Sequence, residues 1–253
     1  NFLLHRFENK IVIEGTLKSL TALHIGSGKH TYSLQDADNT VIRSGRDHTP
    51  FIPGSSIKGV LRSYLEMLLA STDIYGKCCI VTENACLEPK AHKTYLREVK
   101  AKYKNNPEKL AEELYNKLCP ICRLFGSQVV SSKIQIKDAM LTNKVPVETR
   151  DGIAMDRDTG TAAHGKKYNF ECVSAGAEFS FLMTIDNVEP EYEKLVKMLI
   201  HALEDGELTL GGRKSIGLGE VQLINTKVYK VEKEQLMDYA LEGLTEEMRW
   251  ENV

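Results

Sequence analysis

The order of hydrophobic periodicities along the chain is the feature that most restricts its fold. Two segments carry apolar residues at helical spacing: residues 51–71, where Ile57, Leu61 and Leu65 share one face, and residues 191–203. Four segments alternate as half-buried strands do: KIVIEGTLKS, KIQIKDAML, EFSFLMTID and EVQLINTKV. Along the chain these segments run strand, helix, two strands, helix, strand.

This order predicts a ferredoxin-like α+β domain. We expect the first strand to run on to a turn at residues 26–28, and Ser55 or Ser56 to cap the first helix after a Pro53-Gly54 turn. A length of 253 residues is compatible with one elaborated domain, so residues 1–253 are predicted to form a single domain. The charged stretch at its end, residues 232–253, is expected to be a helical tail.

Two segments interrupt the order and are predicted to be insertions. Residues 71–122 hold five of the six cysteines, and a helix is predicted to begin at Asn106-Pro107, because Pro suits the first helical position. Residues 143–170 are polar, with turn signals at Asp151-Gly152 and Thr159-Gly160. This second insertion is predicted to be a protruding β-hairpin arm.

Charge and hydropathy limit the class of protein. The chain has 33 Lys and Arg against 35 Asp and Glu, a net charge of −2, which argues mildly against a protein coated in nucleic acid. A basic stripe can nevertheless coexist with an acidic remainder. No apolar run approaches the ~20 residues that cross a bilayer, and the first residues, NFLLHRFENK, do not resemble a signal peptide. We therefore expect a cytoplasmic protein with no membrane partner.

The cysteines of the first insertion have the spacing of metal ligands. Cys119-x-x-Cys122 is a metal knuckle, because two thiolates two residues apart can bind one tetrahedral ion. Cys78 or His92 could replace a ligand of the other half, and a cluster of free thiols is the alternative. The predicted ligands of a closed, structural zinc site are Cys79, Cys86, Cys119 and Cys122.

The start of the first helix has two possible meanings. Ser55-Ser56-Ile57-Lys58 matches the S-x-x-K pattern of penicillin-recognising serine enzymes, but their S-D-N and K-T-G elements are absent. Two hydroxyls and free N–H groups, with Lys58 and Arg62 one turn apart, favour instead a site for a nucleic-acid phosphate. A plain helix cap with solvated charges is the alternative.

The segment LGGRKSIGLG, residues 210–219, is a second candidate phosphate site. It is neither a Walker loop nor a dinucleotide fingerprint, since Lys214 precedes the later glycines and a strand follows. Four glycines beside Arg213 and Lys214 let the backbone approach a phosphate closely. A simple helix-to-strand turn would also use these glycines.

Together these segments resemble the RAMP superfamily of CRISPR systems, and most of all the backbone subunits of type III effectors. Five segments carry the resemblance in order: LHIGSG, ADNTVIR, FIPGSSIKGVLRS, CRLFGS with the following strand, and GGRKSIGLGEV. DGIAMDRDTGTA resembles the thumb of the family, and the cysteine insertion is similar to the zinc knuckles of type III-D and fused-effector relatives. The resemblance spans residues ~10 to 225, a length compatible with one domain.

The resemblance implies a modified ferredoxin-like (RNA-recognition-motif-like) fold with a zinc-knuckle insertion at 71–122 and a thumb at 143–170. It also implies that the protein binds guide (CRISPR) RNA, which pairs with complementary target RNA. The protein would assemble with related backbone copies and other effector subunits. Base pairing would then read the target sequence while the protein grips the backbone. The residues implied in RNA binding are His24, Ser55, Ser56, Lys58, Arg62, Gly212, Arg213 and Lys214, with Met155 or Ile153 as a wedge between bases.

The resemblance further implies cleavage of target RNA by an aspartate in the loop after the first strand. The family pattern falls on Asp38, with Asp36 as the neighbouring alternative. A carboxylate there could hold Mg²⁺ or take a proton from an attacking 2′-hydroxyl. The expected activity is thus that of a metal-dependent endoribonuclease.

Two other functions fit the same resemblance. A non-cleaving scaffold would share the fold and the guide grip without a productive Asp38. A stand-alone nuclease that processes guide precursors would rely on a catalytic histidine, and no histidine here lies in a distinctive acid–base setting.

Overall fold

The computed structural model describes residues 6–72 and 74–251 apart from a gap at 31–38. Its strands are β1 Asn9–Ser19, β2 Gly26–His30, β3 Asn39–Val41, β4 Phe51–Ile52, β5 Ile134–Ile136, β6 Ala139–Met140, β7 Val147–Met155, β8 Ala162–Val173, β9 Glu178–Asp186 and β10 Val221–Glu232. Its α-helices are α1 Gly54–Ala70, α2 Lys93–Lys102, α3 Pro107–Asn116, α4 Pro120–Phe125, α5 Glu193–Glu204 and α6 Leu236–Glu242. Short 3-10 turns lie at Pro190–Tyr192, Lys214–Ile216, Lys233–Gln235 and Glu246–Met248.

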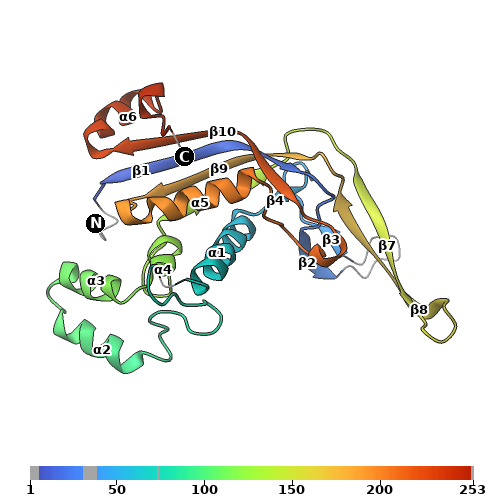
Figure 1. The fold of residues 1–253 in the computed structure, drawn as a ribbon, viewed down its shortest axis with the longest axis horizontal. Helices are drawn as coiled ribbons and strands as arrows, with labels where there is room; N and C mark the ends of the chain where they lie inside the picture. Colours follow the sequence, from blue (N-terminus) through green and yellow to red (C-terminus); the bar gives the residue numbers. More distant parts are fainter. Residues whose placement is uncertain (1–5, 31–38, 73, 252–253) are drawn as a thin grey trace.

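The central sheet has the order β10-β1-β9-β5, and its neighbouring strands pair antiparallel. With α1 after β1 and α5 after β9, this is the ferredoxin-like arrangement, so the predicted fold class is confirmed (Figure 1). The helices α1 and α5 lie on one face of this sheet, and α6 lies on the other. Ile11 and Ile13 of β1 face the main core, whereas Val12 between them packs with Met248 on the opposite side.

The start of α1 differs from the prediction. The helix begins at Gly54, and Pro53 occupies the N-cap position without a side-chain cap, so neither Ser55 nor Ser56 is the cap. A carboxylate from another segment replaces it, because Asp138 Oδ1 accepts a hydrogen bond of 2.8 Å from Gly54 N. A Cβ atom at Gly54 would lie 2.2 Å from Ile136 O, so only glycine lets the helix start this close to β5.

Three further expectations from the sequence were wrong in detail. Residues 26–28 begin strand β2 instead of forming a turn, and KIQIKDAML is divided between β5 and β6, which belong to different sheets. Gly152 lies within β7, where the Tyr168 ring covers it: a Cβ there would lie 2.1 Å from Tyr168 Cζ. The hairpin turns at Asp156, whose side chain accepts hydrogen bonds from the N–H groups of Asp158 and Thr159.

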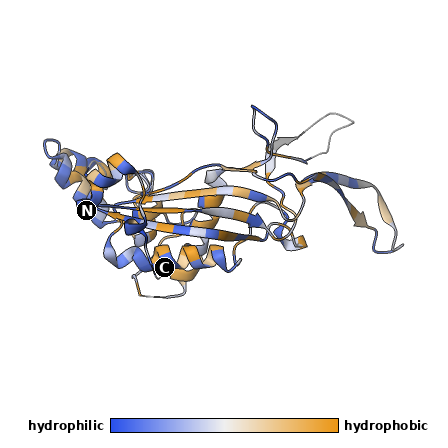
Figure 2. Ribbon diagram, turned by 90° about the horizontal axis from the view of Figure 1, so that it is seen from above, coloured by the Kyte–Doolittle hydropathy of each residue, from blue (hydrophilic) through white to orange (hydrophobic). Residues whose placement is uncertain are grey.

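The predicted arm is a β-hairpin of β7 and β8 that projects from one end of the molecule (Figure 2). Its base belongs to a second sheet of order β2-β3-β8-β7. The cysteine-containing segment projects from the other end and carries α2 and α3. Helix α3 begins at Pro107 with Asn106 as its cap, as predicted, whereas α2 was not anticipated.

A buried polar network fixes the cysteine-containing segment to the core. Lys133 is 2% exposed and donates to Glu189 Oε2 and to Asn187 O, each at 2.7 Å. Tyr115, at the end of α3, donates to the same Glu189 carboxylate. Arg123 of α4 lies over the Tyr115 ring at 4.8 Å.

None of the helices in the described part of the chain is long and apolar enough to cross a membrane.

Candidate metal centre and nucleic-acid interface

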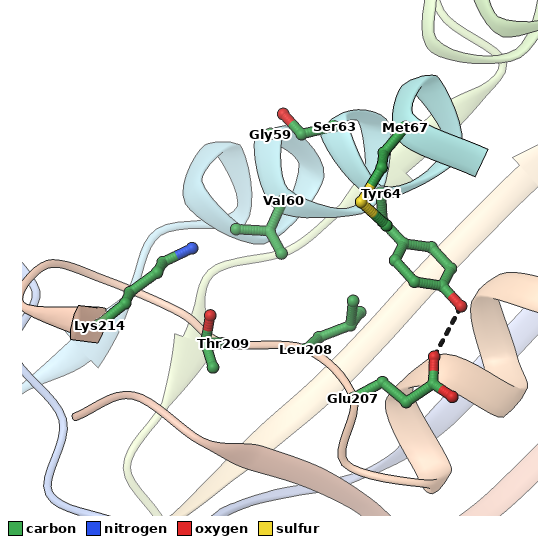
Figure 3. Close-up of a pocket in the computed structure, with 9 residues that line it drawn as sticks. All are labelled: Gly59, Val60, Ser63, Tyr64, Met67, Glu207, Leu208, Thr209 and Lys214. Carbon is green, nitrogen blue, oxygen red and sulfur yellow. Dashed lines mark hydrogen bonds between the residues drawn. The ribbon is translucent and has the colours of Figure 1, made fainter. Parts of the chain in front are cut away.

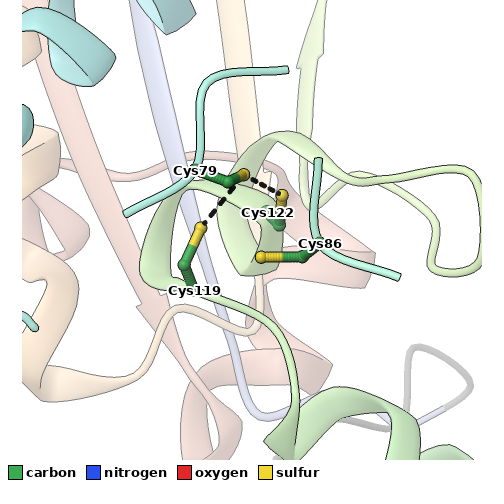
Figure 4. Close-up of side chains that lie close together, drawn as sticks. All are labelled: Cys79, Cys86, Cys119 and Cys122. Atoms are coloured by element: carbon green, nitrogen blue, oxygen red, sulfur yellow. Dashed lines mark hydrogen bonds between the residues drawn. The ribbon is translucent and has the colours of Figure 1, made fainter. Parts of the chain in front are cut away.

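Four cysteine thiols converge beside α4 (Figure 4). The sulfur atoms of Cys79, Cys86, Cys119 and Cys122 all lie within 4.8 Å of one another. Cys79 Sγ lies 3.6 Å from Cys119 Sγ and 3.3 Å from Cys122 Sγ. A tetrahedral ion with bonds of 2.3 Å holds its sulfur ligands about 3.8 Å apart. The cluster therefore has the size and the donor set to hold a metal ion, and it is compatible with zinc.

The electrostatics of the cluster favour a thiolate. Hydrogen bonds from Cys122, Cys79 and Cys86 hold the pKa of Cys119 far below its usual value of 9.0. Thiolates are the form in which cysteine binds a metal ion. The packing of the other three thiols therefore favours the ionised form at one ligand position.

The two alternative ligands lie outside this cluster. The Cys78 thiol is half-buried, and burial raises its pKa to about 11, which disfavours the thiolate. His92 precedes α2 and has its Nδ1 3.2 Å from Glu88 O. Neither belongs to the group of described residues that could share one ion.

His24 is buried at the junction of β8 and the glycine-rich loop. Its Nδ1 lies 2.6 Å from Glu171 O, and because a carbonyl only accepts, Nδ1 carries the proton. His24 O accepts from Gly212 N at 2.8 Å, and a Cβ on Gly211 would lie only 2.2 Å from that oxygen. His24 therefore organises the loop through its backbone, and its ring forms a T-shaped pair with Phe170 in which the ring centroids lie 5.7 Å apart.

Arg213 and Lys214 diverge within the loop. The Arg213 guanidinium lies 3.8 Å from the centroid of Phe170 and 4.9 Å from that of Tyr168, both on β8. Its backbone is left-handed, with φ of 62°. Lys214 is exposed and extends toward α1 (Figure 3). One cation thus packs against the base of the arm, while the other faces an open groove.

That groove lies between the exposed face of α1 and the segment before the loop (Figure 3). It has a volume of about 320 Å³, and Tyr64 closes one end by donating a hydrogen bond of 2.7 Å to Glu207. Burial, followed by this bond, raises the pKa of Tyr64 to about 12, so the hydroxyl stays protonated. The lining residues are Gly59, Val60, Ser63, Tyr64, Met67, Glu207, Leu208, Thr209 and Lys214.

The other predicted RNA-binding residues are not all brought to this groove. Ser55 is exposed and Ser56 half-buried in the first turn of α1, but Lys58 and Arg62 point to partners within the protein. Lys58 Nζ donates to Ser132 Oγ at 2.6 Å and to Ile134 O at 2.9 Å. Met155 lies on the arm and is 60% exposed.

Asp38 and Asp36 lie outside the described residues; the chain is described again from Asn39. Glu171 holds the chain that follows Asn39. Its Oε2 accepts hydrogen bonds from Val41 N at 3.0 Å and from Arg43 at 2.8 Å, and its Oε1 accepts one from Arg43 at 3.2 Å. Burial alone would raise the pKa of Glu171, but these bonds outweigh it and lower the pKa.

Sequence reasoning missed Glu171, Phe170 and Tyr168. Tyr168 and Phe170 stand two positions apart at the end of the predicted arm, and Glu171 follows just beyond it. The alternation Tyr168, Phe170, Cys172 was a strand signal that could have placed two aromatic rings on one face.

The ferredoxin-like sheet, the glycine-rich loop folded over His24 and the projecting arm define a class of protein. The model of the RAMP superfamily matches residues 16–222, and the chain belongs to that superfamily.

Three relatives are similar along most of their length, and each is named CRISPR system Cms endoribonuclease Csm3. The protein from Methanothermobacter thermautotrophicus is 26% identical over 88% of this chain and 87% of its own. That from Methanocaldococcus jannaschii is 28% identical over 90% and 84%, and that from Enterococcus italicus 29% identical over 83% and 88%.

Proposed function

We propose that this chain is a guide-RNA-binding backbone subunit of a type III CRISPR effector complex and that it cleaves target RNA. Membership of the RAMP superfamily and the endoribonuclease relatives support the class of activity. The observation that carries RNA binding is the exposed Lys214 facing α1 across an open groove beside the base of the arm. The protein would act in the cytoplasm as one domain, residues 1–253, with insertions at 71–122 and 143–170.

The guide backbone would follow the groove. Lys214 supplies the cation, and Ser63 and Thr209 supply hydroxyl groups on opposite walls. Ser55 and Ser56 extend this surface with two further hydroxyl groups at the start of α1. Gly212, exposed next to His24, lets a phosphate approach the loop backbone.

The remaining predicted residues take other roles in this proposal. His24 and Arg213 shape the loop from inside, and Lys58 and Arg62 act within the protein. Ile153 and Met155, 52% and 60% exposed, are the apolar side chains with which the arm would separate bases of the paired target.

Two metal ions belong to the proposal. The four cysteines would hold a structural Zn²⁺, whose closed shell leaves no position for catalysis. Asp38 would hold Mg²⁺ or accept a proton from the 2′-hydroxyl of the target strand. Glu171 would fix the chain just after Asp38, because its carboxylate accepts hydrogen bonds from Val41 N and from the Arg43 side chain.

The test is target-RNA cleavage by an effector complex reconstituted with the Asp38→Asn subunit. We expect cutting at this subunit's site to fall by at least about 10²-fold, the range of a lost general base, with guide binding unchanged. Asp36→Asn is the matched control and should cut normally. Unchanged cutting by Asp38→Asn would contradict the enzyme assignment and leave the non-cleaving scaffold as the function.

A further inference from the structure

Arg62 lies on a face of α1 that does not line the groove. Its side chain is only 15% exposed, and all three guanidinium nitrogens have partners within the protein. Nε donates to Glu66 Oε1 at 2.8 Å, Nη1 donates to Gly126 O at 3.0 Å, and Nη2 lies 3.5 Å from Cys122 Sγ. An arginine that binds an external phosphate has N–H donors exposed to solvent in the free protein, and Arg62 does not show this arrangement.

Glu66, the partner of Arg62, contacts the other half of the cysteine cluster. It is 7% exposed, and its Oε1 also accepts a hydrogen bond from Val81 N at 3.3 Å. Val81 stands two residues after Cys79, whereas Arg62 contacts Cys122. One ion pair on α1 therefore touches both chain segments that supply the thiols.

The charge of a filled cluster explains why a guanidinium would lie there. Four thiolates around one divalent ion carry a net charge of about −2, and burying that charge is unfavourable without hydrogen-bond donors. Arg62 offers a charge-assisted N–H···S contact to Cys122 Sγ.

We propose that the Arg62–Glu66 pair is the outer shell of the metal centre and couples metal binding to the position of α1. Arg62 neutralises part of the thiolate charge, and Glu66 holds both the guanidinium and the Val81 backbone in place. Because α1 also forms one wall of the groove, the pair links the cysteine cluster to the surface proposed for guide RNA. This inference rests on the metal site of the proposed function.

The experiment measures zinc affinity of the purified chain by competition with a chromophoric chelator. Arg62→Lys keeps a cation beside Glu66 but loses the forked donors, and Arg62→Met/Glu66→Leu removes the pair without leaving a buried carboxylate alone. We expect both variants to bind zinc about 10–100-fold more weakly, the usual effect of losing an outer-shell partner. Lys58→Met is the matched control, one turn away with no contact to a cysteine, and its zinc affinity should equal that of the wild type.

Two outcomes overturn the inference in different ways. Equal zinc affinity in wild type and both Arg62 variants would remove the outer-shell role and leave the metal site intact. A wild-type chain that binds no zinc would remove both the metal site and the inference, while leaving RNA binding untouched.

A second readout separates this role from a direct phosphate contact. At saturating zinc we expect the logarithm of guide-RNA affinity to depend on the logarithm of salt concentration with the same slope for Arg62→Met/Glu66→Leu and wild type. A guanidinium bound to phosphate would lower that slope by about 0.7 when removed. Such a loss at full metal occupancy would overturn the inference.

Discussion

The Arg213 guanidinium lies 3.8 Å from the centroid of the Phe170 ring and joins the glycine-rich loop to the base of the arm. The same group lies 4.9 Å from the Tyr168 ring, and Tyr168 in turn covers Gly152 of the neighbouring strand. The loop, β8 and β7 are therefore held in one stack. The direction of the arm depends on this stack, because most of the described side chains between residues 149 and 167 are exposed.

The first prediction concerns Arg213. Arg213→Ala should lower the free energy of unfolding by about 1–2 kcal/mol, since the cation–π contacts are lost. Arg213→Gly should be about 1 kcal/mol more stable than Arg213→Ala, because the backbone φ of 62° suits glycine. Urea unfolding measures both values. Equal stability of the Ala and Gly variants would contradict a strained loop at this position.

The second prediction concerns the four cysteines proposed to bind zinc. Cys122→Ser should lose the bound zinc and lower Tm by roughly 6–12 °C, which corresponds to about 3 kcal/mol in a chain of this size. Cys78→Ser should keep its zinc, because the Cys78 sulfur lies outside the four-thiol cluster. Metal content by mass spectrometry and calorimetric Tm check the pair. Zinc loss in Cys78→Ser would show that the cluster uses a different fourth ligand.

The third prediction concerns the buried Lys133–Glu189 pair. Lys133→Met should destabilise the fold by about 3–5 kcal/mol, because Glu189 would remain buried without its cation. The double variant Lys133→Met/Glu189→Leu should lose much less, since it leaves no lone charge. Chemical denaturation of the two variants gives the comparison, and a larger loss in the double variant would contradict the argument.

The fourth prediction is the pH dependence of that pair. Burial alone would raise the pKa of Glu189, but hydrogen bonds from Lys133 and Tyr115 outweigh it and hold the pKa below the ordinary 4.5. A depressed folded-state pKa means that the stabilisation is complete above pH 4.5 and is lost as pH falls through the folded value. Burial lowers the pKa of the Lys133 ammonium group in the folded state. For a cation this shift has the opposite sign, so deprotonation of Lys133 at high pH does not by itself lower the free energy of unfolding.

The acid sensitivity is measured by the urea midpoint between pH 7 and pH 3. We expect the wild type to lose stability below about pH 4.5 more steeply than Lys133→Met/Glu189→Leu. Parallel curves for the two proteins would show that other carboxylates account for the acid transition.

The fifth prediction concerns the tip of the arm. Ile153→Ala/Met155→Ala should change the free energy of unfolding by less than about 0.5 kcal/mol, because both side chains are largely exposed. Target cleavage by the assembled complex should fall about tenfold, the factor for about 1.4 kcal/mol of lost apolar contact. Met237→Ala, an equally exposed position on α6, is the control and should cut normally.

The fold could be predicted wherever the pattern of one segment was sufficient. The spacing of Ile57, Leu61 and Leu65 placed α1, and Asn106-Pro107 placed the start of α3. The cap of α1 could not be predicted, because Asp138 reaches Gly54 from 84 residues away. A cap from a distant segment leaves no signal in the local sequence.

The site shows the same division. The Cys-x-x-Cys spacing predicted a thiol cluster that could hold a metal ion, since two of its four cysteines are only three positions apart in the chain. The roles of Lys58 and Arg62 depend instead on Ser132 and Gly126, which the sequence places more than sixty residues away. A cation on a helix has the same local pattern whether it faces solvent or a backbone carbonyl.

The position of β1 in the central sheet has a consequence for synthesis on the ribosome. Both of its neighbours, β9 and β10, are encoded late, and about 160 residues separate the end of β1 from the start of β9. At 5–20 residues per second, β1 waits roughly 8–30 s before a partner strand emerges. During that time Ile11, Ile13 and Leu17 have no sheet to join, so the first strand stays an unpaired apolar segment of the kind that promotes aggregation.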